Sequence, residues 1–593
     1  MESRATSYEL IEVAQGSRPA DLYIKGGTVI NVYSGEFMKQ NVAVYRDRIA
    51  YVGGSEAAIG DQTQVIDANG KYISPGFIEP HAHPWVIYNP VSFAVKVLSL
   101  GTTTIVNDNL FFYLHMEVEG FAKMVRDLQV LPINHLWLAR IVSQADYVGE
   151  RDYFAPEQVQ RLLELEQVAG TAEVTRWPLL YNGDPFAIQT VEYAKRLGKV
   201  VDGHTAGCSY EKLNAIVAAG VSACHEAITA QESLDRLRLG MWTTLRNSSL
   251  RPDFPEVVKL ITEANIQTQR ILMTTDGPHP AYIEEEGCVD GLVRKAVELG
   301  VAPMQAIQMA TINPATYLRL DDQIGGIAPG RRADLLVLPD LVDFRPELVI
   351  CGGRVVAEHG NLLVTPPSID WSQYLAGPAF SIQKSFLQDP DLYRYPHTSP
   401  DEPVPVIHFR STVITQPKSI HLPVRDGFAD ISQQPGLLLA CLIDRHGRWV
   451  ARGLLENFAT TLDGMASTYN TTTHPLVIGR DPVSMAIAAA RVHELGGGVA
   501  VVDRGEVVLE IPLPLTGMMT TDTSFATAVE YQRQLLSALQ ERGYPYHDIL
   551  YTLLFLTCDF LPGLRLIPLG LYDVKANRVI QPAVQMERER VRR

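Results

Sequence analysis

Residues 75–84 read PGFIEPHAHP, an apolar segment that ends in two histidines separated by one residue. Alternate side chains of an extended segment point the same way, so His81 and His83 can face a single metal ion. The next apolar segment, GTTTIVND at 101–108, is also short, β-branched and polar at its end. Two such segments in succession predict buried parallel strands whose polar ends gather at one rim.

The pattern set by these two segments continues from Ser74 to about Leu320, where apolar runs alternate with helix-like segments. Apolar strands that alternate with helices indicate a parallel α/β architecture. A span of about 250 residues suits a (β/α)8 barrel of the TIM type better than a doubly wound sheet. The helix-like segments include PEQVQRLLELEQV (156–168), SYEKLNAIVAAG (209–220), ESLDRLRLG (232–240) and DGLVRKAVELG (290–300).

The segments on both sides of residues 74–320 resemble β-hairpins. Short β-rich runs with Gly-Gly turns extend from about Asp21 to Tyr72 in the predicted unit 1–73, and GGIAPGRRADLLVL begins a similar stretch at 321–365. Neither flank can bury much surface alone, so we expect the two flanks to complete one small β-sandwich. Residues 366–400, rich in Pro, Ser and Asp, predict a linker. Residues 401–593 contain both strand and helix patterns and predict a C-terminal α+β domain.

The composition limits the cellular locations and binding partners that can be expected of the chain. The formal net charge is -16, and the only basic run is Arg588, Arg590, Arg592 and Arg593, so we do not expect nucleic acid as a partner. The six cysteines are scattered without a CxxC pair, which favours a reducing compartment. The N-terminus lacks the apolar core of a signal peptide, and no stretch of 18 uncharged apolar residues occurs. We therefore expect a cytoplasmic location and no membrane partner.

Further residues of metal-ligand type close later apolar runs in the predicted barrel. Glu173 lies in GTAEVTRWP, His204 follows KVVDG, His225 follows GVSAC, and Asp276 ends ILMTTD. The carboxyl ends of barrel strands converge on one mouth, so these residues can meet His81 and His83 in space. The sequence therefore predicts a metal site.

This set of four histidines and two carboxylates exceeds what one tetrahedral ion needs, and suits Zn²⁺, Mn²⁺ or Fe²⁺. Two divalent ions, with one carboxylate bridging them, would account for the surplus. A water held between such ions would lose a proton near neutral pH and become a hydroxide nucleophile.

PGFIEPHAHP, GTTTIVND and GGIAPGRRADLLVL, with the ordered ligands between them, resemble the amidohydrolase superfamily, and within it the adenine deaminase family, in a divergent bacterial branch. The resemblance continues through FATTLDGMASTYNTTTHPLVIGRDP (458–482) and LGGGVAVVDRGEVVLEIPLPLTG (495–517), so it covers nearly the whole chain. It implies a (β/α)8 barrel and a small-molecule substrate, and it implies self-association as a dimer or larger homo-oligomer.

The resemblance also implies a role for each ligand. His81 and His83 would bind the deeper metal, and His204 and His225 the outer one. Glu173 would bridge both ions. Asp276 would contact the first metal, accept a proton from the attacking water and deliver it to the leaving nitrogen. Mn²⁺ or Fe²⁺ is the expected metal, with Zn²⁺ as the alternative.

Several residues near the presumed ligands are candidates for substrate contacts. Trp85, Asn89 and Trp177 lie just beyond presumed ligands. Asp108 ends the second predicted strand, and LRNSSLRP (245–252) supplies Arg246 and Ser249 at the seventh strand end. Glu226, beside His225, could orient that imidazole as a hydrogen-bond acceptor. The predicted substrate contacts are Trp85, Asn89, Asp108, Trp177, Arg246 and Ser249.

Three functions compete at this point. The first is hydrolytic deamination of adenine or a related aminopurine to hypoxanthine and ammonia. The second is hydrolysis of another C–N bond, in an amide, a lactam or imide ring, or a different amino-heterocycle, because HAHPWVIYNP and NDNLFFYLH depart from the family's HVHIESS and DPHEIANV. The third is a binding or scaffold barrel without catalysis, but such a barrel would be expected to lose metal ligands, whereas this chain keeps them.

Overall fold

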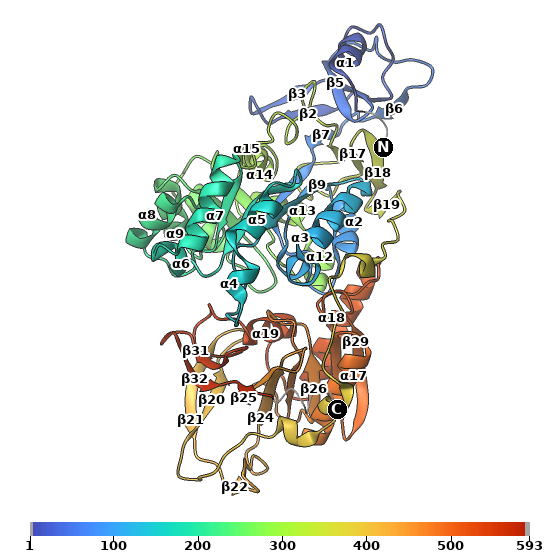
Figure 1. Ribbon diagram of the computed structural model, residues 1–593. Coiled ribbons are helices and arrows are strands. Elements are labelled where there is room, and N and C mark those ends of the chain that lie inside the picture. Colours follow the sequence, from blue (N-terminus) through green and yellow to red (C-terminus); the bar gives the residue numbers. More distant parts are fainter. Residues whose placement is uncertain (1–3, 587–593) are drawn as a thin grey trace.

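A barrel of parallel strands is the central unit of the computed structural model, which describes residues 4–586 (Figure 1). The eight strands of this sheet follow one another in the same order in sequence and in space, each parallel to its neighbour. The predicted fold class is confirmed. The strands are β8 (Phe77–Ala82), β9 (Thr102–Asp108), β10 (Asn134–Ala139), β11 (Val168–Val174), β12 (Val200–Gly203), β13 (Ala223–Cys224), β14 (Trp242–Arg246) and β15 (Ile271–Thr274).

The barrel closes between its first and last strands. Ala82, at the end of β8, forms a parallel β-bridge with Asp276, two residues beyond β15. The backbone N–H of His83 donates to the carbonyl oxygen of Asp276 at 3.3 Å. Ring closure therefore joins the two segments that carry three of the predicted metal ligands.

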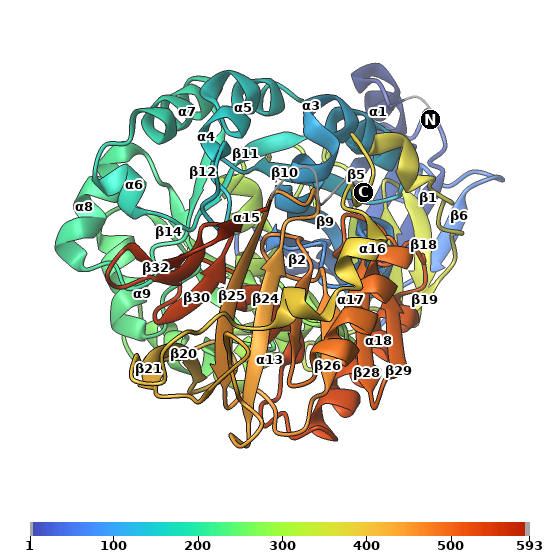
Figure 2. The ribbon, with the colours of Figure 1, turned by 60° about the horizontal axis from the view of Figure 1, so that its bottom comes forward.

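Helices between the strands surround this ring (Figure 2). Polar side chains cap several of them: Asp184, Ser209 and Thr229 accept backbone N–H groups at the starts of α7, α8 and α9. The predicted helix at 156–168 ends early, at Leu163, because Val168 already begins β11. The helices are α2 (Pro90–Ser99), α3 (Leu110–Asp127), η1 (Leu128–Val130), α4 (Glu150–Tyr153), α5 (Pro156–Leu163), α6 (Pro178–Tyr181), α7 (Pro185–Arg196), α8 (Tyr210–Ala219), α9 (Ala230–Arg238), α10 (Phe254–Val257), α11 (Lys259–Thr262), α12 (Pro280–Glu286), α13 (Val289–Glu298), α14 (Pro303–Ala310) and α15 (Ile312–Tyr317).

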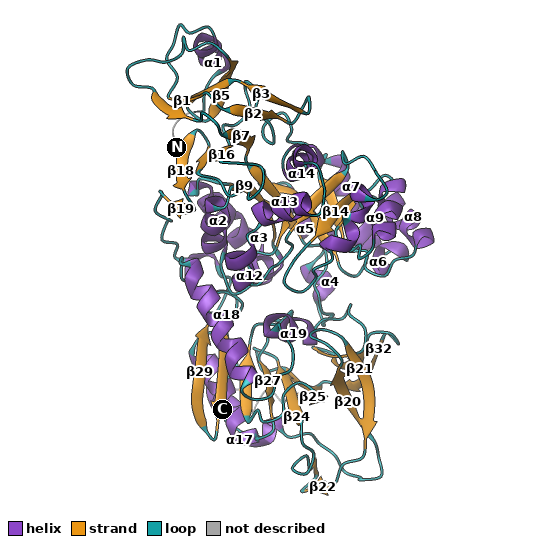
Figure 3. Ribbon diagram, turned by 180° about the vertical axis from the view of Figure 1, so that it is seen from behind, coloured by secondary structure: helices purple, strands orange, loops and turns teal. Residues whose placement is uncertain are grey.

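The two flanks of the barrel share one seven-stranded sheet, as Figure 3 shows at the top of the molecule. Its strands before the barrel are β2 (Thr28–Asn31), β3 (Glu36–Lys39) and β7 (Tyr72–Pro75), and those after it are β16 (Leu335–Leu338), β17 (Leu348–Cys351), β18 (Arg354–Glu358) and β19 (Asn361–Leu362). β7 and β16 join the two flanks in antiparallel register. The second sheet contains β1 (Leu22–Lys25), β4 (Asn41–Tyr45), β5 (Arg48–Gly53) and β6 (Gln64–Asp67), and a common apolar core links it to the first. Helix α1 (Ser7–Ala14) covers its outer side.

The segment predicted as a linker, 366–400, packs against both of its neighbours. Trp371 and Tyr374, in η2 (Trp371–Tyr374), are buried, and the Tyr374 hydroxyl donates to Asp127 at the end of α3. Leu387 of α16 (Lys384–Leu387) and Tyr393 of η3 (Pro390–Tyr393) are buried in the core of the following domain. The segment therefore connects the two domains through packed contacts.

The C-terminal domain consists of a nine-stranded sheet with helices against it. Helix α17 (Pro482–Glu494) buries Met485, Ala488 and Val492 on the sheet, while α18 (Phe525–Gln540) and α19 (Ile549–Leu556) lie toward the barrel (Figure 1). The strands of the main sheet are β20 (Val404–Phe409), β21 (Thr415–Ile420), β24 (Leu437–Ile443), β25 (Trp449–Glu456), β26 (Gly464–Ser467), β27 (Leu476–Gly479), β28 (Gly498–Asp503), β29 (Glu506–Pro512) and β33 (Val584–Gln585). Smaller sheets contain β22 (Val424–Arg425) with β23 (Phe428–Ala429), and β30 (Leu564–Ile567), β31 (Gly570–Asp573) and β32 (Arg578–Pro582).

One boundary differs from the predicted one. The first barrel strand begins at Phe77 rather than residue 74, because residues 72–75 belong to the flanking sheet as β7. The ends of the predicted first and last units, residues 1–3 and 587–593 with the basic run near the C-terminus, lie outside the described residues. Within residues 4–586, no helix has the length and apolar character needed to cross a bilayer.

Candidate metal centre

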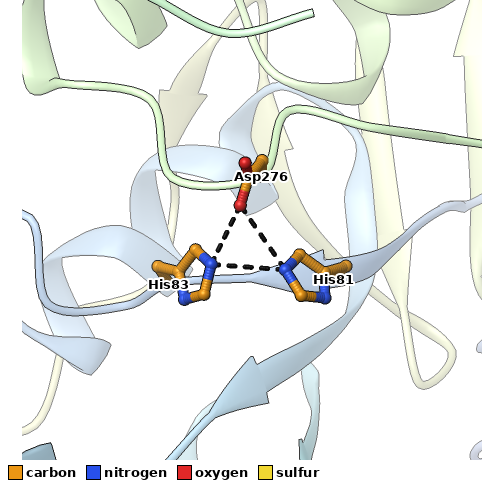
Figure 4. Close-up of side chains that lie close together, drawn as sticks. All are labelled: His81, His83 and Asp276. Carbon is orange, nitrogen blue, oxygen red and sulfur yellow. Dashed lines mark hydrogen bonds and ion pairs between the residues drawn. The ribbon is translucent and has the colours of Figure 1, made fainter. Parts of the chain in front are cut away.

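The structure brings the six predicted ligands together at the carboxyl ends of the strands. Figure 4 shows the first group, in which His81 and His83 of the β8 end face Asp276. The Nε2 atoms of the two histidines lie 3.2 Å apart, and Asp276 Oδ1 is 3.4 Å from His81 Nε2 and 2.9 Å from His83 Nε2. All three side chains are buried or nearly so.

The second group contains Glu173, His204 and His225, from the ends of β11, β12 and β13. Glu173 Oε2 lies 2.6 Å from His204 Nδ1 and 3.3 Å from His225 Nε2. The other carboxylate oxygen, Oε1, faces the first group at 3.7 Å from His83 Nε2. Glu173 thus presents one oxygen to each group.

These donor atoms fit a divalent cation. Atoms bound about 2.1 Å from a common ion lie roughly 3.0–3.4 Å apart on its coordination sphere. The separations of 2.9, 3.2 and 3.4 Å in the first group match this spacing. His81 Nδ1 lies 2.6 Å from Asp202 Oδ2, so it carries the ring proton and leaves the lone pair of Nε2 facing His83. Two imidazole nitrogens held this close favour a shared cation.

Buried charges fix the carboxylates in their ionised form. Burial alone would raise the pKa of Asp276, but its contacts with His81 and His83 hold it well below its usual range. Burial likewise opposes ionisation of Glu173, and Arg140 with His204 holds its pKa well below the usual range. Both carboxylates are therefore ionised at neutral pH and available to bind a cation.

Glu79 connects the two strand ends that carry the first group of ligands. This fully buried carboxyl accepts hydrogen bonds from the His81 N–H at 3.2 Å, the Thr274 hydroxyl at 2.6 Å, and the N–H and hydroxyl of Thr275, both at 2.9 Å. It thereby ties the end of β8 to the end of β15. Asp276 has a positive φ of 61°, a strained conformation for a residue other than glycine, which the surrounding contacts hold in place.

Two further positioning residues escaped the sequence prediction. Arg140, at the end of β10, donates to Asp108 at 2.5 Å and to Glu173 Oε1 at 2.6 Å, and its side chain is fully buried. Asp202 orients His81 from the end of β12. Both residues could have been identified from the sequence, because each is a charged residue at the end of an apolar strand.

A small cavity of about 70 Å³ opens above the two groups. Of the predicted substrate contacts, Trp85 and Arg246 line it. Glu226, predicted to orient His225, also lines it, at 3.6 Å from His225 Nε2 and 3.7 Å from His204 Nδ1, and forms an ion pair with Arg246. Arg246 also reaches Asp276 Oδ2 at 3.1 Å.

The other four predicted contacts do not line this cavity, because each is engaged in a local structural role. Asn89 caps helix α2 and donates to the carbonyls of Thr520 and Asp522. Asp108 forms an ion pair with Arg140, and the Trp177 indole N–H donates to the carbonyl of Ala206. The Ser249 hydroxyl accepts the His279 N–H and donates to Asp548.

The C-terminal domain supplies part of the cavity wall. Tyr551 and Phe555 of α19 line the cavity with Phe560, and the Tyr551 hydroxyl donates to the carbonyl of Gly277, next to Asp276. On the barrel side, Gln144 from the loop after β10 also lines it. Sequence reasoning missed these residues because ILYTLLFL at 549–556 has the composition of an ordinary core helix, and Gln144 lies in the loop after β10 rather than directly at the strand end.

Comparisons with known proteins agree with this fold and with its candidate ligand groups. The amidohydrolase family model matches residues 72–356, and the adenine deaminase C-terminal domain model matches residues 412–578. A Bacillus cereus protein named "Putative adenine deaminase" is 34% identical, covering 98% of this chain and 96% of its own length. Proteins named "Adenine deaminase" from Moorella thermoacetica and Cenarchaeum symbiosum are 31% and 32% identical, covering 95% and 98% of this chain and 96% and 95% of their own lengths.

The barrel and its ligand groups define a metal-dependent hydrolase of the amidohydrolase class, which acts on C–N bonds. Because relatives above 30% identity match along nearly the full length of both chains, this chain belongs to the adenine deaminase family. In a solved structure, the β-aspartyl dipeptidase of Fervidobacterium islandicum AW-1 is 17% identical, with a TM-score of 0.45 over 58% of this chain and 98% of that one.

We expect His81→Ala to lower the metal content of the purified protein, because it removes one nitrogen of the first group. Bound metal per chain is measured by inductively coupled plasma mass spectrometry after desalting. His135→Phe is the matched control, since both ring nitrogens of this buried barrel histidine lack a hydrogen-bond partner among residues 4–586. Equal metal in His81→Ala and wild type would show that the ligand assignment is wrong.

Asp202→Ala should weaken metal binding on the order of 10- to 100-fold, because His81 would lose the acceptor that fixes its tautomer and ring orientation. Titration of metal-free protein with a fluorescent chelator as competitor measures the affinity. Asp202→Glu, which keeps a carboxylate, should recover part of the loss. An unchanged affinity in Asp202→Ala would exclude the positioning role.

Proposed function

We propose that this protein catalyses the hydrolytic deamination of adenine, or of a closely related aminopurine, to hypoxanthine and ammonia. The observation that carries the proposal is the convergence of all six ligands beneath a small cavity with an aromatic wall. Full-length relatives named adenine deaminase support the same reaction. Such an enzyme would take part in purine metabolism, and six free cysteines among the described residues favour a cytoplasmic location.

We propose two divalent cations as cofactors, with Mn²⁺ or Fe²⁺ favoured and Zn²⁺ as the alternative. His81, His83 and Asp276 would hold one, and Glu173, His204 and His225 the other. Mixed imidazole and carboxylate ligands suit these metals. When bound, such cations lower the pKa of a water molecule toward neutrality.

Asp276 is the group that moves the proton. Its Oδ1 lies at the floor of the cavity beside His83, and its low pKa keeps it ready to accept a proton from the attacking water. Water oxygen bonds to C6 of adenine while Asp276 takes the proton, and the C6–N6 bond breaks as Asp276 returns that proton to N6. Water and adenine thus yield hypoxanthine and ammonia, with no atom left over.

Arg246 and Glu226 position Asp276 from the wall of the cavity. The guanidinium contacts Asp276 Oδ2 at 3.1 Å and pairs with Glu226, so Oδ1 remains turned toward the histidines. Arg246 is only 2% exposed, and its charge is balanced by three carboxylates, including Asp253 at 3.5 Å. This arrangement restrains the proton carrier in one orientation.

Two unused polar groups can recognise the edge of a heterocycle. Among residues 4–586, the side-chain oxygen of Gln144 and the indole N–H of Trp85 have no hydrogen-bond partner, although both residues are buried and line the cavity. A buried polar group without a partner costs free energy, which a bound ligand with complementary groups restores. A purine ring offers both donors and acceptors for this purpose.

The test is an assay of purified full-length protein, loaded separately with Mn²⁺, Fe²⁺ or Zn²⁺, against adenine. Loss of adenine absorbance and release of ammonia are followed together, with metal-free protein as the control. Turnover of adenine that depends on the metal is the expected result. Turnover only of an amide, an imide or another amino-heterocycle in a parallel panel would transfer the assignment to that C–N bond.

Asp276→Asn should lower kcat for adenine on the order of 10²- to 10⁴-fold, because an amide cannot carry the proton between water and N6. Steady-state rates and bound metal are measured on the same preparation. Asp322→Asn is the control, since this carboxylate is exposed and lies outside the ligand groups. Wild-type kcat in Asp276→Asn would contradict its catalytic role.

Gln144→Leu should raise KM for adenine about 3- to 10-fold with a smaller change in kcat, because the substrate loses one hydrogen bond of about 0.5–1.5 kcal/mol. Gln158→Leu, on the exposed side of helix α5, is the control. Bound metal should stay at the wild-type level in both variants. An unchanged KM in Gln144→Leu would remove Gln144 from the substrate site.

A further inference from the structure

A second cavity, of about 410 Å³, lies between the barrel and the C-terminal domain. His115 of α3 and Ser143 line it from the barrel, while Arg445, Thr473 and His474 line it from the C-terminal domain. None of its described lining residues belongs to the cavity above the metal ligands. It is therefore a separate space, large enough for a small organic molecule.

Arg445 is a buried cation at this cavity that forms no direct ion pair among residues 4–586, and its guanidinium lies over the Phe380 ring at 5.6 Å. It is 7% exposed, and its guanidinium donates only to the His115 ring, at 2.9 Å, and to the Thr473 carbonyl at 3.2 Å. Its Nε has no partner, and within residues 4–586 no carboxylate lies within 4 Å of it. Burial lowers the pKa of Arg445 to about 10. A buried charge left in this condition is costly unless an anion accompanies it.

The nearby carboxylates do not supply the anion that would balance the charge of Arg445. Asp444, beside Arg445 in the chain, is fully buried but forms two hydrogen bonds with Arg448, at 2.6 and 3.0 Å. Glu117 lines the cavity but is exposed to solvent. Burial lowers the pKa of His474 to about 3, so its imidazole is neutral at pH 7. Its Nδ1 accepts the Arg445 backbone N–H at 3.1 Å, which leaves the Nε2 N–H as a donor for an oxyanion. The His115 ring is engaged by Arg445 and by the Thr473 hydroxyl.

Backbone strain occurs on both sides of the same cavity. Thr473 has φ of 56°, a rare conformation for a β-branched residue. Opposite it, Glu117 has φ of 54° and ψ of -167° within α3, a region that favours glycine. Each such residue costs of order 1–3 kcal/mol, and strain of this kind concentrates at ligand sites.

We propose that this cavity binds a small molecule carrying a phosphate group, with Arg445 as its principal contact. Arg445 supplies the charge, and His474, which lines the same cavity, can donate its Nε2 N–H to a phosphate oxygen. A guanidinium with free N–H donors is well suited to phosphate. The cavity volume leaves room for an organic portion beyond the phosphate. The site is independent of the deaminase reaction.

Isothermal titration of the metal-loaded full-length protein tests the proposal with inorganic phosphate, ribose 5-phosphate and uncharged ribose. Both phosphates, or ribose 5-phosphate alone, should bind, and ribose should not. Arg445→Met should weaken binding on the order of thirtyfold or more, because a buried charged partner is lost. Arg410→Met, an exposed arginine of the same domain, should leave it unchanged.

Absence of binding by both inorganic phosphate and ribose 5-phosphate would overturn the proposal. So would binding that persists unchanged in Arg445→Met, because such binding belongs to the metal centre. A crystal of the wild-type protein grown with ribose 5-phosphate provides a measurement that does not depend on how the variant folds. Phosphate density within hydrogen-bond distance of Arg445 is the expected result. Density only at the metal ligands, or none, would exclude the site.

Discussion

The closure of the barrel between β8 and β15 is the constraint on which the rest of the structure depends. The bridge between Ala82 and Asp276 completes the ring, and the buried carboxyl of Glu79 ties both strand ends together through four hydrogen bonds. Burial raises the pKa of Glu79 to about 7, which shows that an ionised carboxylate at this buried position costs free energy. The same closure brings Asp276 to the two histidines. Folding of the barrel and assembly of the first ligand group are thus one event.

The barrel and the ligands could be predicted from sequence because both follow local patterns. Apolar runs that end in His81, His204 or Asp276 identify strand ends, and barrel topology places all strand ends at one mouth. The substrate contacts could not be predicted as well, because they depend on side-chain direction. Asn89 and Trp177 lie close to ligands in the chain, yet one caps a helix and the other bonds to a loop carbonyl. Tyr551 and Phe560 reach the cavity only through the packing of a distant domain.

The C-terminal domain is part of the site architecture as well as a cover. Helix α19 forms one wall of the cavity, and the N–H of Asp559 donates to the carbonyl of Gln144 at 3.1 Å. Arg176, three residues beyond Glu173, pairs with Glu150 and lies 3.7 Å from Asp559. Ser143 and Gln144 are neighbours that line two different cavities. One barrel loop therefore contacts the metal-site cavity, the interdomain cavity and the second domain.

The shared flanking sheet has a consequence for biosynthesis. Strands β2 and β7 leave the ribosome early, but their sheet gains β16 to β19 only after residues 335–362 have been translated. Until then, apolar side chains such as Val29 and Ile73, which are buried in the finished protein, lack their partners from the later strands. The barrel strands are therefore synthesised while β2 and β7 of the flanking sheet still lack their later partners. A chaperone that shields β2 and β7 during this interval would protect the chain from aggregation.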